Sequence, residues 1–287
     1  MPLSFRRHTG SDAFLAAAGS FLAAREAEHN LIFGICSWLR LNPDVDGSAH
    51  FATVSDGDST VLAAIRTAPH NLVLSTVDDL GAVDALADHL RDDDLPGVLG
   101  PTEAAARFAS RWAATRGGSS RLLDSERIFR LSRVIPPARP AAGSWRHLEP
   151  SDHAVVARWI VDFQTEALPE EPPIEDPDLV ADRWIAQAGR IGYVWVADGA
   201  VVSFAGASGE TPNGIRIGPV YTPPEHRNRG YATSLTAAVS QDQLDRGRRF
   251  TFLFTDLANP TSNRIYPAIG YEPVVDMAKH VFTTPHA

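Results

Sequence analysis

The spacing of apolar residues alternates between a helical and a strand period along the first half of the chain. Phe14, Ala18 and Leu22 follow a cap at Ser11 with helical spacing, and a second helix is predicted from about residue 28. Apolar runs split by turn residues then predict an antiparallel meander. From the meander onward, the predicted elements are strands at 51–55, 60–65 and 72–75, a helix over 78–91, a strand at 97–99, a helix over 102–115 and a strand at 127–134.

A stretch rich in proline and small residues, 136–144, separates this half from a second one in which the same order begins again. The elements predicted there are a strand at 145–148, helices beginning near residue 152 and over 179–188, strands at 192–197, 200–208 and 215–221, a helix over 231–245 and a strand at 250–255. The repetition predicts two tandem α/β domains, 1–135 and 145–287, each a mixed, mostly antiparallel sheet flanked by helices.

Charge and composition narrow the classes of partner. The 287 residues carry a formal charge of −9 at pH 7, whereas a nucleic-acid-binding protein usually presents a basic face. Cys36 is the only cysteine, so the chain has no internal disulfide. The longest apolar run, around 31–41, is too short to cross a bilayer, and the first residues lack the pattern of a signal peptide. We therefore expect a soluble, cytoplasmic protein with no nucleic-acid or membrane partner.

The most informative stretch joins the strand at 215–221 to the helix that begins at Tyr231. Its loop reads Arg227-Asn228-Arg229-Gly230-Tyr231-Ala232. Gly230 can adopt a positive φ and Ala232 is small, so the backbone can approach a ligand closely. The first amide groups of the helix have no intrahelical partner and lie at the positive end of the helix dipole. The stretch therefore predicts an anion site suited to phosphate.

This loop resembles Arg/Gln-x-x-Gly-x-Gly/Ala, the pyrophosphate-binding loop of the GNAT acetyltransferase superfamily. A later segment resembles the superfamily's Asn-x-x-Ser/Ala-x-x-x-Tyr-x-x-x-Gly-Phe/Tyr through Asn259, Ser262, Tyr266, Gly270 and Tyr271. Pro267, inside the predicted helix, is an unusual residue there and should kink it. Because both motifs occur in the order and spacing of the family, residues 145–284 are identified as a member of the GNAT superfamily.

The resemblance implies a GNAT-fold N-acetyltransferase that uses acetyl-CoA (coenzyme A) as cosubstrate and no metal, with a primary amine, expected in a small molecule, attacking the thioester directly. Tyr266 matches the tyrosine that protonates the departing thiolate, a role suited to a phenol with a pKa near ~10, although it can also simply pack. The implied cofactor-binding residues are Val220, Tyr221, Thr222 and Asn259 for the pantetheine arm, and Arg227, Asn228, Arg229, Gly230, Tyr231, Ala232 and Thr233 for the pyrophosphate.

The base that removes the proton of the amine is the least determined part of the site. Glu210, at the end of a predicted strand, is the first candidate, and Glu225 and His226 lie beside the loop. Each of the three can equally be a turn residue.

A run of carboxylates and prolines at 166–178 allows two interpretations. It is either a solvated loop, as most charged runs are, or a negative rim that attracts a cationic amine. In the second case, Glu170, Glu171 and Glu175 contribute to binding of the acceptor.

The first half lacks the phosphate loop. Residues 75–81 place Asp78 and Asp79 at the helix start, where they would repel a pyrophosphate. We therefore expect a degenerate GNAT-like domain at 1–135 and one active site per chain; a helical and sheet domain of no particular family is the alternative for this half. The alternative function is a non-catalytic acyl-CoA-binding or interaction protein. The identity of the amine and the occurrence of a homodimer stay open.

Overall fold

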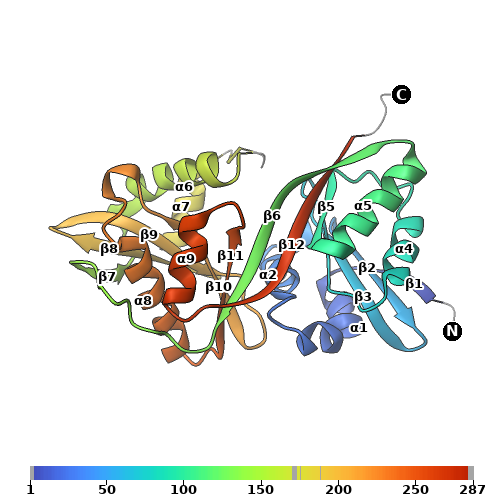
Figure 1. Ribbon diagram of the computed structural model, residues 1–287, viewed down its shortest axis with the longest axis horizontal. Coiled ribbons are helices and arrows are strands. Elements are labelled where there is room, and N and C mark those ends of the chain that lie inside the picture. Colours follow the sequence, from blue (N-terminus) through green and yellow to red (C-terminus); the bar gives the residue numbers. More distant parts are fainter. Residues whose placement is uncertain (1–2, 170–172, 175, 188, 284–287) are drawn as a thin grey trace. The chain divides into compact units, whose positions relative to one another are not determined.

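The two halves of the chain repeat one order of elements (Figure 1). This computed structural model describes residues 3–169, 173–174, 176–187 and 189–283. The first half contains β1 (Leu3–His8), α1 (Ser11–Ala24), α2 (Asn30–Arg40), α3 (Pro43–Asp46), β2 (His50–Asp56), β3 (Ser59–Arg66), β4 (Leu72–Leu74), α4 (Leu80–His89), β5 (Gly97–Pro101), α5 (Thr102–Arg116) and β6 (Ser119–Leu131). This order confirms the meander and the helices expected from the sequence.

The second half follows the same plan, and the predicted fold class and tandem architecture are confirmed. It contains β7 (Ser144–His147), α6 (His153–Ala167), α7 (Pro177–Ile185), β8 (Arg190–Ala197), β9 (Ala200–Ser208), β10 (Gly214–Tyr221), α8 (Tyr231–Asp245), β11 (Phe250–Asp256), α9 (Pro260–Ala268) and β12 (Glu272–Thr283), with short 3-10 turns η1 (Pro150–Asp152) and η2 (Pro224–His226). None of the helices in the described part of the chain is long and apolar enough to cross a membrane.

Contacts divide the chain into two units whose limits differ from the predicted domain boundaries at the C-terminal end. The first unit comprises Met1–Phe129, Phe254–Pro260 and Pro273–Ala287, and the second comprises Arg130–Leu253 and Thr261–Glu272. The end of the chain groups with the first half because β12 pairs antiparallel with β5, from Met277 opposite Pro101 to Val281 opposite Gly97. The unit to which β12 belongs is thus set by backbone pairing, which the pattern of apolar residues does not reveal.

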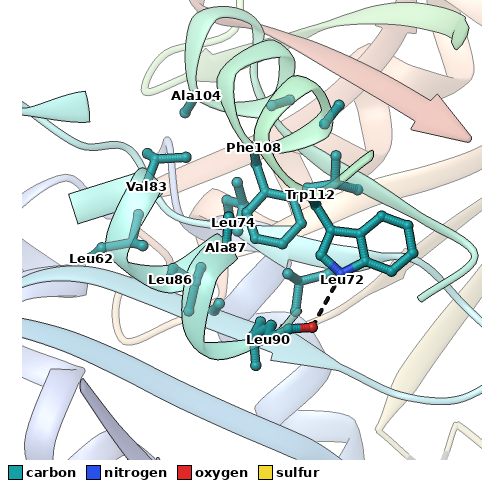
Figure 2. Close-up of a cluster of buried hydrophobic side chains, with 14 of the residues drawn as sticks. Leu62, Leu72, Leu74, Val83, Leu86, Ala87, Leu90, Ala104, Phe108 and Trp112 are labelled. Carbon is teal, nitrogen blue, oxygen red and sulfur yellow. Dashed lines mark hydrogen bonds between the residues drawn. The ribbon is translucent and has the colours of Figure 1, made fainter. Parts of the chain in front are cut away.

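In the first unit, β1 to β4 form an antiparallel meander and β4 pairs in parallel with β5. Neighbouring strand residues point to opposite faces, so Phe51 contacts the cluster of α1 and α2 while Ala52 contacts the cluster of α4 and α5. Figure 2 shows the second of these clusters, with Phe108 and Trp112 of α5 packed against α4 and the sheet.

Two strands were not predicted from the sequence, and a third is longer than predicted. β1 alternates, but only two of its six residues are large and apolar, Leu3 and Phe5. β12 is interrupted by Asp276, Lys279 and His280. β6 begins at Ser119, eight residues before the predicted start, because its first residues are polar or exposed. Hydrophobic periodicity is weak in all three segments.

In the second unit, β7, β8, β9 and β10 pair antiparallel in that order, and β10 pairs in parallel with β11. The two faces of this sheet carry different helices. Leu235 and Val239 of α8 pack with Ile217, whereas Trp159 of α6 packs with Tyr221. The helix that follows the predicted phosphate loop therefore lies on one face of β10, and the last side chain of β10 points to the other.

Trp112 anchors the cluster drawn in Figure 2. It is 1% exposed, its indole N–H donates to the carbonyl oxygen of Leu90 (3.1 Å), and its ring stacks on Phe282. We expect Trp112→Ala to lower the free energy of unfolding of the first unit by about 3–5 kcal/mol, because a large cavity forms. Urea denaturation measures this change. Ser110→Ala, on the exposed face of the same helix, serves as the control, and a loss below about 1 kcal/mol for Trp112→Ala would contradict this packing.

Candidate active site

The site begins where β10 leaves its parallel neighbour. Among the described residues, the ladder between β10 and β11 joins Gly214–Arg216 to Phe250–Phe252 and extends no further. A bulge between Ile217 and Val220 then shifts the register of β10 on β9. Peptide groups on the β11 side of the last residues of β10 are consequently left without a ladder partner, and they can bind an extended ligand.

The loop after β10 holds the start of α8 open. Asn228 and Gly230 both adopt left-handed backbone conformations, with φ of 63° and 81°. Gly230 is the N-cap of α8 and has no side chain to bind the first amide groups of the helix. The first intrahelical bond runs from the Ser234 N–H to the Gly230 carbonyl oxygen (3.0 Å). The N–H groups of Tyr231, Ala232 and Thr233 are therefore the orphan donors that favour an anion at this point.

The segment before β7 braces this helix start. The Ala141 N–H donates to the Ser234 hydroxyl (2.9 Å), and the Trp195 indole N–H donates to the Ala142 carbonyl (2.8 Å). A methyl group on Gly230 would lie 3.8 Å from both the Arg139 carbonyl oxygen and the Ala141 side chain. The stretch predicted as a linker thus packs along the loop and the start of α8.

The corresponding helix start in the first half is closed by a carboxylate. Asp79 is the N-cap of α4, and its side chain accepts a hydrogen bond from the Gly81 N–H (2.9 Å). Asp78 pairs with Arg25 (2.7 Å). A carboxylate at the N-cap uses the amide groups that a phosphate would need and adds like-charge repulsion. This geometry supports the expectation that the first half does not hold a pyrophosphate.

The guanidinium group of Arg227 turns away from the helix start. It donates to the Glu166 carboxylate (2.6 Å) through one nitrogen and to the Thr222 carbonyl (2.8 Å) through another. Glu166, in the last turn of α6, also accepts a hydrogen bond from the Tyr221 hydroxyl (3.1 Å). Arg229 is exposed, as Arg227 is. Of the two arginines predicted to contact pyrophosphate, only Arg229 has its side chain outside this cluster.

The end of β10 is held by side chains of its own unit. The buried Ser203 hydroxyl donates to the Tyr221 carbonyl (3.1 Å) and is 2.8 Å from the Thr222 hydroxyl. Burial, and then the hydrogen bond to Glu166, raise the pKa of Tyr221 to about 12. Two carbonyl groups predicted to face the pantetheine arm, those of Tyr221 and Thr222, therefore already have one internal donor each, and each keeps a second lone pair.

Tyr266 lies in α9 and is 7% exposed. Burial raises its pKa to about 12, against a hydrogen bond with Ser262 that lowers it. Its ring meets Tyr271 edge to face at 5.9 Å, and the Tyr271 hydroxyl lies 2.8 Å from that of Ser240 in α8. Tyr266 is thus linked, through Tyr271, to the helix that follows the phosphate loop. A tyrosine in this environment is protonated at neutral pH.

The other predicted residues lie in three places. Val220 is partly buried on the α8 face of the sheet. Asn259 directly precedes α9, and its backbone N–H donates to the Asp256 carbonyl (3.0 Å). Glu225 and His226 belong to the 3-10 turn at the start of the loop.

Glu210 lies at the other end of β10 from the phosphate loop, and its role as the base that removes the proton of the amine stays a prediction. Glu210 lies in the turn that leads into Gly214, the first residue of β10, whereas the loop follows Tyr221, the last residue of this eight-residue strand. At about 3.3 Å per residue, roughly 20 Å separates the two ends. The Glu210 carboxylate pairs with Arg248, beyond the C-terminal end of α8. The sequence shows that Glu210 ends a strand, but not that this end lies opposite the loop.

Three members of the carboxylate run, Glu170, Glu171 and Glu175, lie outside the described residues. Asp176 caps α7 by accepting from the Leu179 N–H (2.9 Å), so this part of the run is structural. Glu166, the first residue of the run, is the one that contacts the end of β10. Within the run, Glu166 differs from the other carboxylates only in its helical spacing from the buried Trp159, and this spacing is the signal in the sequence that could have identified it.

Comparisons with known proteins agree with this geometry. Residues 155–271 match the model of the Acetyltransferase (GNAT) family, and the match includes the loop and Tyr266. No curated protein matches the sequence significantly. Within the described part of the chain, no group of three or more His, Cys, Asp or Glu side chains is arranged to hold a metal ion.

Several solved structures share the fold over nearly the whole chain. A Drosophila protein aligns with a TM-score of 0.69 and 14% identity over 98% of both chains. A tandem GNAT protein from the clavulanic acid biosynthesis pathway aligns with a TM-score of 0.59 and 16% identity over 100% of both chains. A GCN5-related N-acetyltransferase from Sphaerobacter thermophilus aligns with a TM-score of 0.54 and 17% identity over 99% of this chain and 97% of that chain.

At such identities the likeness to solved structures concerns the fold, while the family model concerns the sequence of the second half. The two findings support each other because the matched range contains the open helix start described above. The chain therefore contains a domain at residues 155–271 that matches the Acetyltransferase (GNAT) family, and over its whole length it is similar in fold to a tandem GNAT protein.

Proposed function

We propose that the second half of the chain is an acetyl-CoA-dependent N-acetyltransferase that acetylates a primary amine of a small molecule. One observation carries this proposal: the open amide groups at the start of α8 follow the part of β10 that has separated from β11. A helix start supplies donors for a pyrophosphate, and an unpaired strand edge supplies partners for an amide-containing arm.

The residues present fit coenzyme A. The N–H groups of Tyr231, Ala232 and Thr233 are orphan donors, and the exposed Arg229 adds positive charge beside them. The last residues of β10, up to Val220, offer peptide groups on the side that has left β11. Acetyl-CoA supplies the activated acyl group, and the chain supplies binding, orientation and proton transfer.

Tyr266 is the proposed acid. Its pKa, raised to about 12 by burial, keeps the phenol protonated over the whole neutral range. A protonated phenol can donate to a departing thiolate, whereas a group with a low pKa would already have lost its proton. The edge-to-face contact with Tyr271 fixes the orientation of the ring.

The alternative is an acyl-CoA-binding protein without turnover, and the pairing of Glu210 with Arg248 favours it because this ion pair engages the carboxylate of the first candidate base. A thiol-release assay separates the two functions. We expect release of free CoA thiol from acetyl-CoA in the presence of at least one primary amine from a panel of polyamines, aminoglycosides, amino acids and lysine peptides. Binding of acetyl-CoA without release for any amine would favour the alternative.

Gly230 allows a test of the phosphate site by charge alone. Gly230→Asp places a carboxylate at the N-cap of α8, as Asp79 does in α4, whereas Gly230→Asn is its neutral match. Both replacements belong to the residue types that tolerate a left-handed conformation. We expect the KM for acetyl-CoA to be at least about tenfold higher for Gly230→Asp than for Gly230→Asn, which corresponds to about 1.4 kcal/mol. Equal KM values for the two variants would exclude a phosphate group at this helix start.

Tyr266→Phe removes the proposed proton donor and keeps the ring. We expect kcat to fall by about 10- to 100-fold, with little change in the KM for acetyl-CoA, because proton transfer contributes to the chemical step. Steady-state kinetics measures both constants. Tyr193→Phe, a buried tyrosine bonded to Asp242 in the C-terminal part of α8, is the matched control and should keep its kcat. An unchanged kcat for Tyr266→Phe would remove Tyr266 from the mechanism.

A further inference from the structure

The face of the β10 sheet opposite α8 carries an acidic cluster that the proposed cofactor site does not use. Tyr221 ends β10 on this face, and Glu166 approaches it from the last turn of α6. Asp162, one turn earlier on the same helix, is close enough to act electrostatically on the Tyr221 hydroxyl. The Glu166 carboxylate and the Arg227 guanidinium thus meet at the end of β10.

Glu166 is fixed in place and still accessible. One carboxylate oxygen accepts from Tyr221 (3.1 Å) and the other from Arg227 (2.6 Å). The side chain nevertheless remains 45% exposed. An ionised carboxylate has about four acceptor positions, so two remain for a further donor. A preorganised carboxylate with free lone pairs suits an ammonium group.

Arg227 has the contacts of a positioning residue. Its two hydrogen bonds go to Glu166 and to the Thr222 carbonyl, and its guanidinium carbon lies 5.8 Å from the centre of the Tyr221 ring. All three partners belong to the acidic cluster or to the end of β10. The positive charge of Arg227 is therefore already matched by Glu166, and Arg229 is the loop arginine left for phosphate.

The sheet separates this cluster from the helix start. α8 packs on the face that carries Ile217, and α6 packs on the face that carries Tyr221. A ligand anchored by phosphate at α8 and an amine bound at Glu166 would then approach the end of β10 from opposite faces. Such an arrangement keeps the negative charges of the phosphates and of Glu166 apart.

We propose that Glu166 binds the ammonium group of the acceptor, that Arg227 positions this carboxylate instead of binding phosphate, and that the acceptor is therefore a cationic amine. This inference rests on the proposed function, because it takes the ligand at Glu166 to be the amine that accepts the acetyl group. It assigns Glu166 to acceptor binding and Arg227 to the orientation of Glu166.

Calorimetric titration of the CoA-saturated protein with 1,4-diaminobutane, 2-phenylethylamine and kanamycin tests the inference. We expect at least one of these amines to bind. Glu166→Gln should weaken its binding by about tenfold or more, because the charged carboxylate that accepts hydrogen bonds from the ammonium group is replaced by a neutral amide. Asp245→Asn, an exposed carboxylate at the far end of α8, is the matched control and should bind as the native chain does. Failure of all three amines to bind, or unchanged binding by Glu166→Gln, would overturn the proposal.

A double-mutant cycle tests the positioning role of Arg227. We expect Arg227→Gln to weaken amine binding, and Glu166→Gln combined with Arg227→Gln to be no weaker than Glu166→Gln alone, since Arg227 acts through Glu166. The dissociation constant for CoA should change less than about threefold in Arg227→Gln and more in Arg229→Gln. Additive losses, or a larger loss of CoA binding in Arg227→Gln, would contradict this role.

The thiol-release assay keeps this inference distinct from the proposed function. Amine binding that depends on Glu166 without any thiol release would remove the acetyltransferase proposal and leave the acceptor site standing. Thiol release that is insensitive to Glu166→Gln would support the acetyltransferase proposal and remove the role of Glu166 in binding the amine.

Discussion

The hydrogen-bonding demand of the first amide groups of α8 is the constraint on which the second half depends. These groups need acceptors, and Gly230, in a left-handed conformation at the N-cap, provides none from a side chain. In α4 the same demand is met by Asp79. A single residue at the helix cap thus distinguishes the half whose helix start can bind an anion from the half whose helix start is already hydrogen-bonded to its own carboxylate.

The separation of β10 from β11 gives this helix start its chemical setting. Pairing that ends at Arg216 leaves a strand edge leading to the loop, and the bulge after Ile217 keeps Tyr221 directed at the face of α6. The phosphate donors and the Glu166 carboxylate consequently occupy opposite faces of one strand end. The sheet would keep the negative phosphates of a ligand on one face apart from the Glu166 carboxylate on the other, and Ser203 and Arg227 hold the end of β10 that lies between them.

Local patterns in the sequence predicted the parts of the protein that depend on local chemistry. The meander, the helix from Tyr231 and the aspartates at the start of α4 all follow from periodicity, glycine and capping. Properties that depend on pairing were missed: β12 joins β5, and Glu210 lies at the far end of β10. The contacts of Glu166 could not be predicted for a similar reason, because its partners Tyr221 and Arg227 lie more than fifty residues away in the sequence.

Only one of the two halves is proposed to bind coenzyme A. Calorimetric titration of the full chain with CoA measures the number of sites directly. The difference between Gly230 and Asp79 predicts one CoA per chain. Two sites per chain, or no binding at all, would contradict the account.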